Sequence, residues 1–544
     1  MSFSKKKMLV TCAFPYANGS IHIGHLLEQI QADIWVRYQR LRGHIVWFIC
    51  ADDAHGTAIM IKAKNSGLSS ENIINATLLE HINDFKSFNI SHDNYHTTHS
   101  SENLYFLKKF FKILNKKKLI NEKNIIQLYD PVEKMFLPDR LIQGQCPICN
   151  KHDQYGDNCE QCGSIYDSLE LINPISMLSK TKPVLRNSNH LFFNLPYFQD
   201  QLKNWIDSGV LQKPVMNKSK EWFKKGLKKW NISRDAPYFG FKIPSYEDKF
   251  FYVWLDAPIG YISTFKNLCV KNKNICFDDF WKKDTETLLY HFIGKDIIYF
   301  HCLFWPAILD ALEFRKPTKI FVHGYVTMKG LKLSKSKNST ILAKDWIRYL
   351  DSDTLRYYYA SKLSNKIDDI EINLEEVVIK VNSDIVNKVI NLASRTAKII
   401  NKYFSNKLSD VLDDDNLHSF FLNCSIEIEL FLENREYSEA IRKIMNLADI
   451  GNKYINSRAP WMILKRKGIV KEVQDVCSMG IHLFRILMIW LKPIVPVLAI
   501  KTELLLRSKL SWHMMHSPLL SHEINTFKKL FKRLDINLIK NLLI

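Results

Sequence analysis

The stretch from Met8 to His25 reads MLVTCAFPYANGSIHIGH, and it decides the fold. Its apolar first third predicts a strand, the Pro- and Gly-bearing middle predicts a turn, and the amphipathic segment from Leu26 to Leu41 predicts a helix. A helix that starts after such a turn favours phosphate groups, because its first backbone N–H groups are unpaired and its dipole is positive there. His22 and His25 add side-chain donors, and Gly24 lets a flat base or a phosphate approach the backbone closely.

A second basic motif, Lys332-Leu333-Ser334-Lys335-Ser336, lies past the middle of the chain. Lys332 and Lys335 supply mobile positive charges, which a triphosphate needs when its negative charge redistributes. Either motif alone is weak evidence. Together, in this order and separation, they resemble the two nucleotide motifs of the class I aminoacyl-tRNA synthetases.

The composition favours an anionic partner. Among 544 residues, 76 are Lys or Arg and 56 are Asp or Glu, which gives a net charge of +20. Neutralised phosphates supply most of the non-specific affinity for nucleic acid, so this excess suits a polyanion. The alternative is a surface rich in merely solvated lysine, and charge alone does not decide between the two. The length predicts three or four structural units.

No feature of the sequence predicts a membrane segment or a secretion signal. The chain leads from Met1 straight into the first strand, with no small-residue cleavage site. The most apolar late stretch, Met479 to Ile500, is interrupted by charges and prolines. It therefore predicts a buried helix followed by a turn rather than a bilayer span. We expect a soluble, cytoplasmic protein that has no membrane partner.

Four of the eleven cysteines form a cluster with its own chemistry. Cys146 and Cys149 make one CxxC turn, and Cys159 and Cys162 make a second one shortly after it. Two such turns present four thiolates to one point, which predicts a tetrahedral Zn²⁺ site. Disulfides are the alternative, and a reducing cytoplasm argues against them. Because four thiolates fill the coordination sphere, the ion should be structural rather than catalytic.

Strand-like and helical segments alternate in two separated parts of the chain, which predicts an α/β class with a Rossmann-type parallel sheet. The halves of this catalytic domain are expected at 1–118 and 232–330, and the segment 119–231, with its knuckle at 146–162, is expected as an inserted domain. The strand-like runs are Leu9 to Ala13, Val46 to Cys50, Phe250 to Leu255, Leu288 to Ile293 and Ile320 to Val322. Ligands of such sheets bind at the carboxyl ends of the strands, so both basic motifs should converge there.

From about Asp353 onward the pattern is almost wholly helical. Apolar residues step by three and four, as in the series Val378, Val381, Ile385, Val389 and Leu392, which marks one buried stripe. The segment 389–544 therefore predicts an all-α bundle, and 331–388 holds the lysine motif and the connection to that bundle.

Longer matches point to one family. The chain resembles the bacterial methionyl-tRNA synthetases from Met8 nearly to its end. The matching stretches are 12–19 (CAFPYANG), 51–57 (ADDAHGT), the four-cysteine knuckle, 251–258 (FYVWLDAP), 291–297 (HFIGKDI) and 322–325 (VHGY).

This resemblance implies a reaction. ATP, accompanied by Mg²⁺, and L-methionine would form methionyl-adenylate, and the methionyl group would move to the 3′ end of initiator or elongator tRNA(Met). The methionine carboxylate is itself the nucleophile, so catalysis must come from alignment and charge stabilisation. The implied catalytic residues are His22, Gly24, His25, Lys332 and Lys335. The implied ATP-binding residues are Tyr16, His22, His25, Gly294, Asp296, Lys332, Ser334, Lys335 and Ser336, with Gly24 against the adenine and Asp296 on the ribose.

The resemblance also implies an amino-acid pocket. Asp53 would pair with the substrate ammonium group, a charge-assisted contact. A thioether is a weak acceptor that packs well on aromatic edges, so Tyr261 and His301 are the expected donors near the sulfur. The implied methionine-binding residues are Phe14, Tyr16, Asp53, Trp254, Ala257, Pro258, Tyr261, Ile297 and His301. Ordinary core packing is the alternative for each of them taken singly.

In the helical part, the resemblance makes Asn391, Arg395 and Trp461 the residues that read the CAU anticodon. Asn391 and Arg395 lie at i and i+4, so they share one helix face. A tryptophan with an amide and a guanidinium can stack on an unstacked base and read its edge. The alternatives are a solvated charge for Arg395 and a packing anchor for Trp461. On this assignment 331–388 is a stem-contact region and 389–544 an anticodon-binding domain.

Some positions depart from the family pattern. Leu333 stands where methionine is usual, a swap of similar volume that we expect to be tolerated. Lys337-Asn338-Ser339 replaces the usual Arg-Gly-Thr, and Phe14 replaces a smaller aliphatic residue at the pocket mouth. Many members carry a further C-terminal OB-fold domain for tRNA binding and dimerisation. The chain ends before such a domain, so we expect a monomer with weaker generic tRNA affinity.

Three other interpretations compete with this one. A synthetase of the same class for Leu, Ile or Val would carry a larger inserted editing domain than 119–231 allows, and one for Cys would place a catalytic zinc at the amino-acid pocket. A tRNA-binding relative without catalysis would show damaged nucleotide motifs, but His22, His25, Lys332 and Lys335 are all present. A small nucleotidyltransferase of the same superfamily would lack the helical region.

Overall fold

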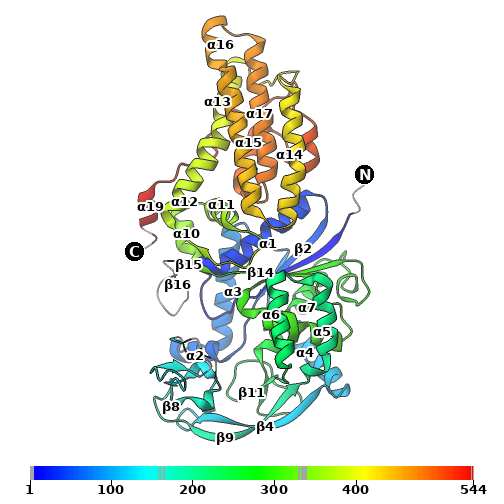
Figure 1. Ribbon diagram of the computed structural model, residues 1–544, viewed down its shortest axis with the longest axis vertical. Helices are drawn as coiled ribbons and strands as arrows, with labels where there is room; N and C mark the ends of the chain where they lie inside the picture. Colours follow the sequence, from blue (N-terminus) through cyan, green and yellow to red (C-terminus); the bar gives the residue numbers. More distant parts are fainter. Residues whose placement is uncertain are drawn as a thin grey trace.

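A computed structural model of the protein describes residues 5–540 and 542, apart from 157, 158, 160, 163, 165, 329, 330 and 333–339. A parallel sheet lies at the centre of the elongated molecule, with a helical bundle at one end and the inserted sheets at the other (Figure 1). This arrangement confirms the predicted fold class. The proposed domain boundaries stay predictions.

Five parallel strands form the central sheet in the order β14-β13-β1-β2-β3. The interior strands are apolar on both faces because helices cover both sides, as is usual for parallel sheets. The helix predicted to follow the first strand is confirmed as α1. The bounds are β1 (Lys7–Cys12), α1 (Ile23–Leu41), β2 (Ile45–Asp52), β3 (Asn94–Thr97), β13 (Leu288–Gly294) and β14 (Lys319–His323).

The prediction of a strand from Phe250 to Leu255 is wrong. Only β12 (Lys249–Phe251) is extended, paired with β11 (Ser233–Asp235), and α7 (Val253–Lys271) begins immediately after it. The aromatic and β-branched residues favour a strand locally, but Leu255, Ile259 and Ile262 recur at helical spacing and are buried, and α7 packs on β2 and β3. Tertiary packing overrides the local propensity here.

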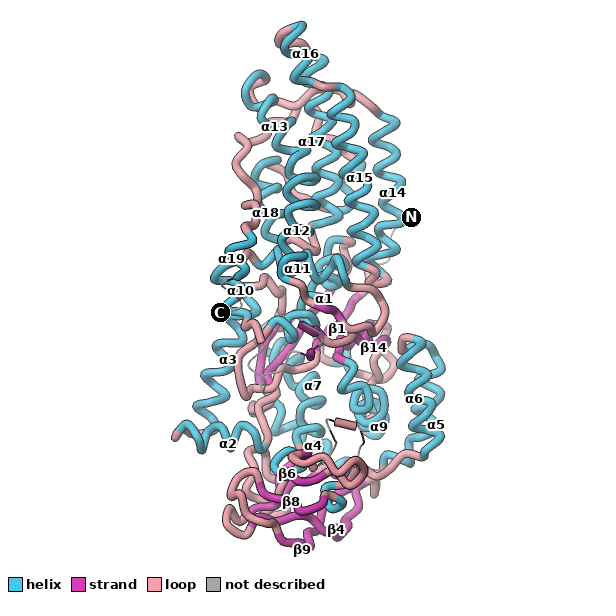
Figure 2. Tube along the Cα trace, turned by 60° about the vertical axis from the view of Figure 1, so that its left-hand side comes forward, coloured by secondary structure: helices cyan, strands magenta, loops and turns pink. Residues whose placement is uncertain are grey.

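Other helices flank the central sheet, and smaller sheets make up the inserted part (Figures 1 and 2). The helices are α2 (Thr57–Ser66), α3 (Ser70–Ser87), α4 (Ser101–Lys116), α8 (Asp278–Trp281) and α9 (Trp305–Ala311). The inserted elements are β4 (Ile120–Asp130), β5 (Met135–Phe136), β6 (Ile142–Gln145), β7 (Gln154–Tyr155), β8 (Ile172–Ser176), β9 (Val184–Phe193), α5 (Gln199–Trp205), α6 (Lys213–Lys225) and β10 (Trp230–Asn231). The long antiparallel pair β4 and β9 spans the inserted part.

The chain then passes through short elements into the bundle. These are β15 (Val326–Met328), β16 (Leu331–Lys332), α10 (Ala343–Tyr349), α11 (Ser352–Lys362) and β17 (Ile370–Glu371). The helices that follow are α12 (Leu374–Val381), α13 (Asn391–Tyr403), α14 (Asp415–Glu433), α15 (Tyr437–Arg458), α16 (Pro460–Lys467), α17 (Lys471–Leu491), α18 (Pro496–Leu506) and α19 (Ile536–Lys540). A wider, π-type stretch, Asn382–Ile390, joins α12 to α13.

Helix α17 is the central helix of the bundle, packed against α13 and α15. By length and composition it is the one helix of the described residues that could cross a membrane, but 89% of its apolar window is buried inside the protein. The prediction of a buried helix followed by a turn is thus confirmed.

Contacts with the bundle and with α11 hold α1, the helix that starts at the histidine motif. Tyr437 donates its hydroxyl hydrogen to the backbone oxygen of Gln31 (3.1 Å), and the Trp35 indole donates to the backbone oxygen of Glu433 (3.3 Å). The buried Arg356 of α11 pairs with the buried Asp33 of α1 (2.7 Å). The position of α1 therefore depends on the bundle as well as on the sheet.

Candidate active site

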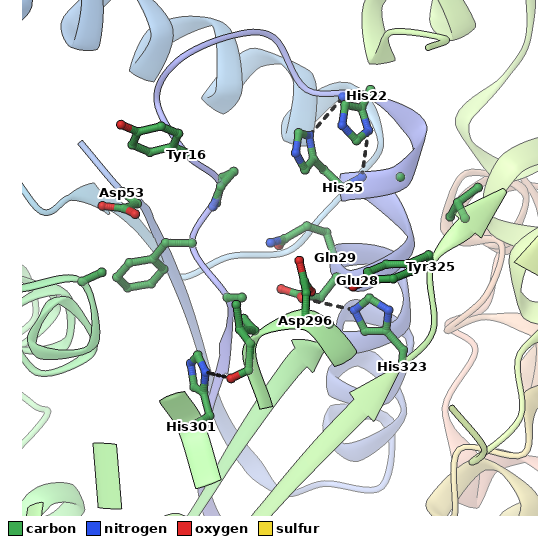
Figure 3. Close-up of a pocket in the computed structure, with 18 of the residues that line it drawn as sticks. Tyr16, His22, His25, Glu28, Gln29, Asp53, Asp296, His301, His323 and Tyr325 are labelled. Atoms are coloured by element: carbon green, nitrogen blue, oxygen red, sulfur yellow. Dashed lines mark hydrogen bonds and ion pairs between the residues drawn. The ribbon is translucent and has the colours of Figure 1, made fainter. Parts of the chain in front are cut away.

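A cavity of about 550 Å³ opens at the carboxyl ends of the central strands, between α1 and α7 (Figure 3). Every predicted nucleotide or methionine residue whose side chain the structure describes lines it, as does Gly24. They are Phe14, Tyr16, His22, His25, Asp53, Trp254, Ala257, Pro258, Tyr261, Gly294, Asp296, Ile297 and His301. The structure brings these residues together, while their individual roles stay predictions.

The two histidines at the start of α1 fix one another. His22 is the N-cap residue, and its Nδ1 accepts from the backbone N–H of His25, while Nδ1 of His25 accepts from the backbone N–H of His22 (both 3.3 Å). The rings stack with centroids 3.6 Å apart. Because each Nδ1 accepts, each neutral ring carries its hydrogen on Nε2. A side chain at position 24 would place its Cβ 2.9 Å from the His22 ring, so glycine is required for this packing.

The lysine motif lies largely outside the described residues. Ser334, Lys335 and Ser336 lie outside the described residues, as do the departures at 333 and 337–339. Only the backbone of Lys332 is described. The chain enters the motif through β16 and leaves it beside the start of α1. There the Ile23 N–H donates to the Ile341 oxygen (3.0 Å), and the Ala343 N–H donates to the Ile21 oxygen (2.9 Å). The segment after the motif is thus hydrogen-bonded to the segment that holds His22.

Some lining residues received no role from the sequence. Glu28 and Gln29 lie three and four residues after His25, so helical spacing from that histidine was the available signal. His323 is the last residue of β14 and contacts Glu28 (Nε2 to Oε2, 3.1 Å), and Figure 3 shows this pair beside Asp296. Burial raises the pKa of Glu28. Burial opposes the charge of His323, but the hydrogen bond and charge of Glu28 raise the pKa of His323 overall.

Asp53 directly follows β2, and its backbone N–H donates to the Pro15 oxygen (2.9 Å). Its carboxyl oxygen Oδ1 is buried and has no hydrogen-bond partner among the described residues. Burial, followed by the nearby charge of Asp256, raises the pKa of Asp53 well above its ordinary value. A carboxylate in this position is costly unless a cation joins it. The geometry therefore suits an ammonium group of a ligand.

The opposite wall of the cavity is aromatic. Trp254 stacks on Phe300, with ring centroids 3.6 Å apart, and Phe14 packs on Tyr261. Tyr261 and His301 were expected to donate to a thioether, but they are paired with each other (2.8 Å), and His301 Nδ1 donates to the Ile297 oxygen (3.1 Å). Burial lowers the pKa of His301 to about 4, so the ring is neutral at pH 7. Tyr261 must turn from His301 before it can donate to a ligand.

The four clustered cysteines lie together in the inserted part. Their sulfur atoms all fall within 4.8 Å of one another, with Cys149 and Cys159 at 3.5 Å and Cys146 and Cys162 at 3.9 Å. Four sulfurs at about 2.3 Å from one tetrahedral Zn²⁺ ion would be spaced by roughly 3.8 Å, so the donor set fits the ion. Backbone N–H groups of Ile148, Cys149 and Cys162 point at the sulfurs of Cys146 and Cys159, which favours thiolates.

The three predicted anticodon residues lie towards the far end of the bundle, on α13 and α16 (Figure 1). The Arg395 guanidinium lies over the Trp461 ring, 4.4 Å from its centroid, and Trp461 is 38% exposed. Asn391 donates to the side-chain oxygen of Asn452 (3.2 Å). Arg395 and Trp461 therefore form one partly exposed surface, with Asn391 one helical turn away.

Comparison with known proteins identifies the family. The family model "tRNA synthetases class I (M)" matches residues 8–397. The methionine–tRNA ligase of Buchnera aphidicola subsp. Acyrthosiphon pisum (strain Tuc7) is 61% identical over 536 residues, or 98% of each chain. That of Buchnera aphidicola subsp. Baizongia pistaciae (strain Bp) is 58% identical over 539 residues, or 99% of each. The chain belongs to the methionine–tRNA ligase family of class I tRNA synthetases.

The fold agrees with this family. A solved structure of Mycobacterium tuberculosis methionyl-tRNA synthetase in complex with methionyl-adenylate superposes with a TM-score of 0.80. The superposition covers 97% of this chain and 100% of that one at 21% identity, so it supports the assignment of the fold alone. Membership of the ligase family confirms the sequence-based identification and excludes the competing classes considered above.

Proposed function

We propose that the protein is a methionine–tRNA ligase that activates L-methionine with ATP and transfers the methionyl group to the 3′ end of tRNA(Met). The observation that carries the proposal is the composition of the cavity. Paired histidine donors at a helix N-terminus, a buried carboxyl oxygen without a partner among the described residues and an aromatic wall all face it. Such a cavity suits a phosphate group, an ammonium group and an apolar side chain at the same time.

Activation needs alignment rather than a protein nucleophile. An oxygen of the methionine carboxylate attacks the α-phosphorus of ATP, an O–P bond forms, and the bond to the leaving pyrophosphate breaks. The Nε2–H groups of His22 and His25 donate to phosphate oxygens, and their mutual Nδ1 contacts hold both rings ready for this. Asp53 binds the ammonium group, Asp296 and Gly294 bind the ribose side, and Lys332 and Lys335 close on the triphosphate together with Ser334 and Ser336.

The methionine side chain lies against Trp254, Ala257, Pro258 and Ile297, with Phe14 and Tyr16 at the mouth. Tyr261 releases His301 and donates to the thioether, while the neutral His301 ring stays fixed by the Ile297 oxygen. This exchange gives selectivity for sulfur without a buried charge.

Two metal ions belong to the proposal. The four-cysteine site of the inserted domain holds one Zn²⁺, which cross-links two turns whose own apolar core is small. Mg²⁺ accompanies ATP and neutralises phosphate charge. Chelation should loosen residues 140–165 in hydrogen exchange, and retention of full protection there after zinc is stripped would argue against a structural ion.

At the far end of the bundle, Trp461 stacks on an anticodon base while Arg395 and Asn391 read base edges. We also propose that the chain acts as a monomer in the cytoplasm. Light scattering should then give a mass near 63.8 kDa, and twice that value would refute the monomer.

Methionine-dependent ATP–pyrophosphate exchange, measured across the proteinogenic amino acids and beside tRNA charging, tests the proposal. We expect exchange with methionine far above any other amino acid, and charging of both initiator and elongator tRNA(Met). Exchange that is fastest with another amino acid would reject the substrate assignment, and charging without exchange would reject the mechanism.

A further inference from the structure

A row of three titratable side chains lies behind the methionine side of the cavity, and the proposed mechanism does not use it. Asp256 Oδ2 is 2.5 Å from His55 Nδ1, and His55 Nε2 is 2.9 Å from His99 Nδ1. Asp256 and His55 are fully buried, whereas His99 is partly exposed. The row therefore leads from the interior of the catalytic half to its surface.

This row joins two walls of the cavity. His55 follows Asp53 in the loop after β2, where the Ala54 N–H donates to Thr98 Oγ1 (2.9 Å). Asp256 belongs to the first turn of α7, between Trp254 and Ala257, both of which line the cavity. The contact between His55 and Asp256 thus ties the loop that carries the ammonium site to the helix that carries the aromatic wall.

Two buried carboxyl groups, those of Asp53 and Asp256, lie near the proposed ammonium site, and their protonation states depend on each other. Oδ1 of Asp53 and Oδ1 of Asp256 are both buried without a hydrogen-bond partner among the described residues. Burial raises the pKa of Asp256 well above its ordinary value, and the charge of Asp256 adds to burial in raising the pKa of Asp53. Two neighbouring carboxylates repel each other, and one ammonium group needs only one of them.

The hydrogen bonds of the row are satisfied without any charge when Asp256 holds a proton. The Asp256 hydroxyl then donates to His55 Nδ1, and the His55 Nε2–H donates to His99 Nδ1. Burial lowers the pKa of His55 to about 3, which agrees with a neutral ring. Stacking against Phe239 and Phe241, both with centroids 5.4 Å away, fixes the orientation of the His99 ring.

Other titratable groups act on the row from neighbouring elements. Asp52 and Tyr16 lie beside Asp53, Tyr238 lies beside Asp256, and Glu71 lies beside His99. Burial raises the pKa of Tyr16 and of Tyr238 above the ordinary value, so both hydroxyls stay neutral at pH 7. The charge of Glu71 acts at the exposed end, away from Asp53.

We propose that His55 and His99 are positioning residues that keep a proton on Asp256, so that Asp53 is the ionised carboxyl group that meets the ammonium group of methionine. The inference rests on the proposed function, because it assigns Asp53 to the amino-acid substrate. It adds a second carboxyl group whose neutrality is part of the site, and a histidine pair that maintains this neutrality.

The test measures methionine binding without ATP, by calorimetry, as a function of pH. Asp256→Asn imitates the protonated acid, so its dissociation constant should stay within about threefold of the unmodified protein, with the same pH profile. His99→Phe keeps an aromatic ring beside Phe239 and Phe241 but removes the acceptor of the row. Asp256 should then ionise and raise the pKa of Asp53, so the loss of binding on acidification should begin about one pH unit higher.

The double variant Asp256→Asn with His99→Phe decides the matter, because an asparagine cannot ionise and the change in the profile should disappear. His99→Gln keeps an acceptor and should restore the original profile, and kcat at saturating methionine should stay unchanged throughout. His190→Gln is a matched control, since the buried His190 of β9 contacts Asp235 of β11 (2.9 Å), and it should leave the profile unaltered.

Three outcomes would overturn the inference. These are a tenfold or greater loss of methionine affinity in Asp256→Asn, an unaltered profile in His99→Phe, or an altered profile that persists in the double variant. Circular dichroism confirms that each variant is folded, and His99→Gln remains informative where His99→Phe is not. Failure of the unmodified protein to bind methionine would instead reject the proposed function.

Discussion

The waist of the molecule, where α1 meets the bundle, and the wall of the cavity each contain a buried aspartate in a different setting. Asp33 at the waist is fully buried and contacts Arg37 and Arg356 (both 2.7 Å). It also accepts from the backbone and hydroxyl of Ser91 (2.7 and 2.6 Å). At the cavity, Asp53 has one carboxyl oxygen without a hydrogen-bond partner among the described residues, and none of their cations pairs with it. A buried aspartate that is paired with arginines stabilises the fold, whereas a buried aspartate without a cation indicates where a cationic ligand group binds.

The largest effect is expected at the waist. Arg356 donates to the backbone oxygens of Ile494 (3.0 Å), Pro493 (2.9 Å) and Phe88 (3.3 Å) as well as pairing with Asp33. Arg356→Met should lower the free energy of unfolding by about 3–5 kcal/mol, because it leaves a buried carboxylate and several carbonyl groups underpaired. Denaturant titration measures this, with Lys218→Met as a control on an exposed ion pair. A loss as small as that of the control would show that Arg37 alone compensates Asp33.

Asp53→Asn should weaken methionine binding without lowering the free energy of unfolding, the opposite of a substitution at the waist. The variant keeps the shape but loses the charge, so the methionine dissociation constant should rise about a hundredfold, as for one strong charge-assisted contact. The free energy of unfolding should be unchanged or higher, because an unpaired buried charge is removed. Asp33→Asn is the matched control, expected to lose stability while methionine binding changes little. Equal loss of stability in the two variants would break the comparison.

The residues of the cavity and of the waist all stand in the sequence, but only the cavity could be predicted from it. His22 lies at a helix start that follows a strand and a turn, a pattern that favours phosphate by itself, whereas Asp53 was assigned through the family resemblance of its stretch. The partnership of Asp33 with Arg356 joins residues far apart in the chain, and nothing local to either indicates the other. The same holds for Glu28 with His323, where each sits in a recognisable segment but the contact depends on how β14 lies beside α1.

The misread strand at residues 250–255 has a related cause. Local propensity favoured an extended chain, and burial against β2 and β3 imposed a helix. The pairing of Tyr261 with His301 was also beyond the sequence, which showed two donors but not that they face each other. Motifs and family resemblance therefore indicated which residues line the cavity, while tertiary contacts determine which partner each of them has before a ligand arrives.

A third charge extends the comparison to the far end of the bundle. Arg395 has an aromatic ring beneath it rather than a carboxylate, and Trp461 is partly exposed. Trp461→Ala should raise the KM for tRNA by tenfold or more, because stacking on a base contributes about 1–3 kcal/mol. ATP–pyrophosphate exchange should be unchanged. Leu430→Ala, on the exposed face of α14, is the control for loss of a surface apolar group. Equal losses in exchange and charging would assign Trp461 to the fold rather than to tRNA.

The smallest effect is the sharpest test of the comparison, because the two aspartates should respond to pH with opposite sign. Burial works against the charge of Asp33, but Arg37 and Arg356 lower the pKa of Asp33 below its ordinary value of about 3.9. Asp33 therefore stabilises the fold above that value, and this contribution is lost as the pH falls through the lowered pKa. Burial raises the pKa of Asp53, so Asp53 costs stability above about pH 4, and the cost disappears on acidification.

Thermal unfolding midpoints of the ligand-free protein, measured from neutral to acidic pH, should separate the two. Relative to the unmodified protein, Asp53→Asn should unfold at a higher temperature near pH 7, and the gain should vanish below about pH 4. Asp33→Asn should unfold at a lower temperature near pH 7, and its deficit should shrink only at more acidic pH. A tenfold difference in proton affinity between the folded and unfolded chain corresponds to about 1.4 kcal/mol of stability. If the unfolding midpoint shifts in the same direction in the two variants, Asp53 is already paired without a ligand. The cavity would then not need a cation to compensate Asp53.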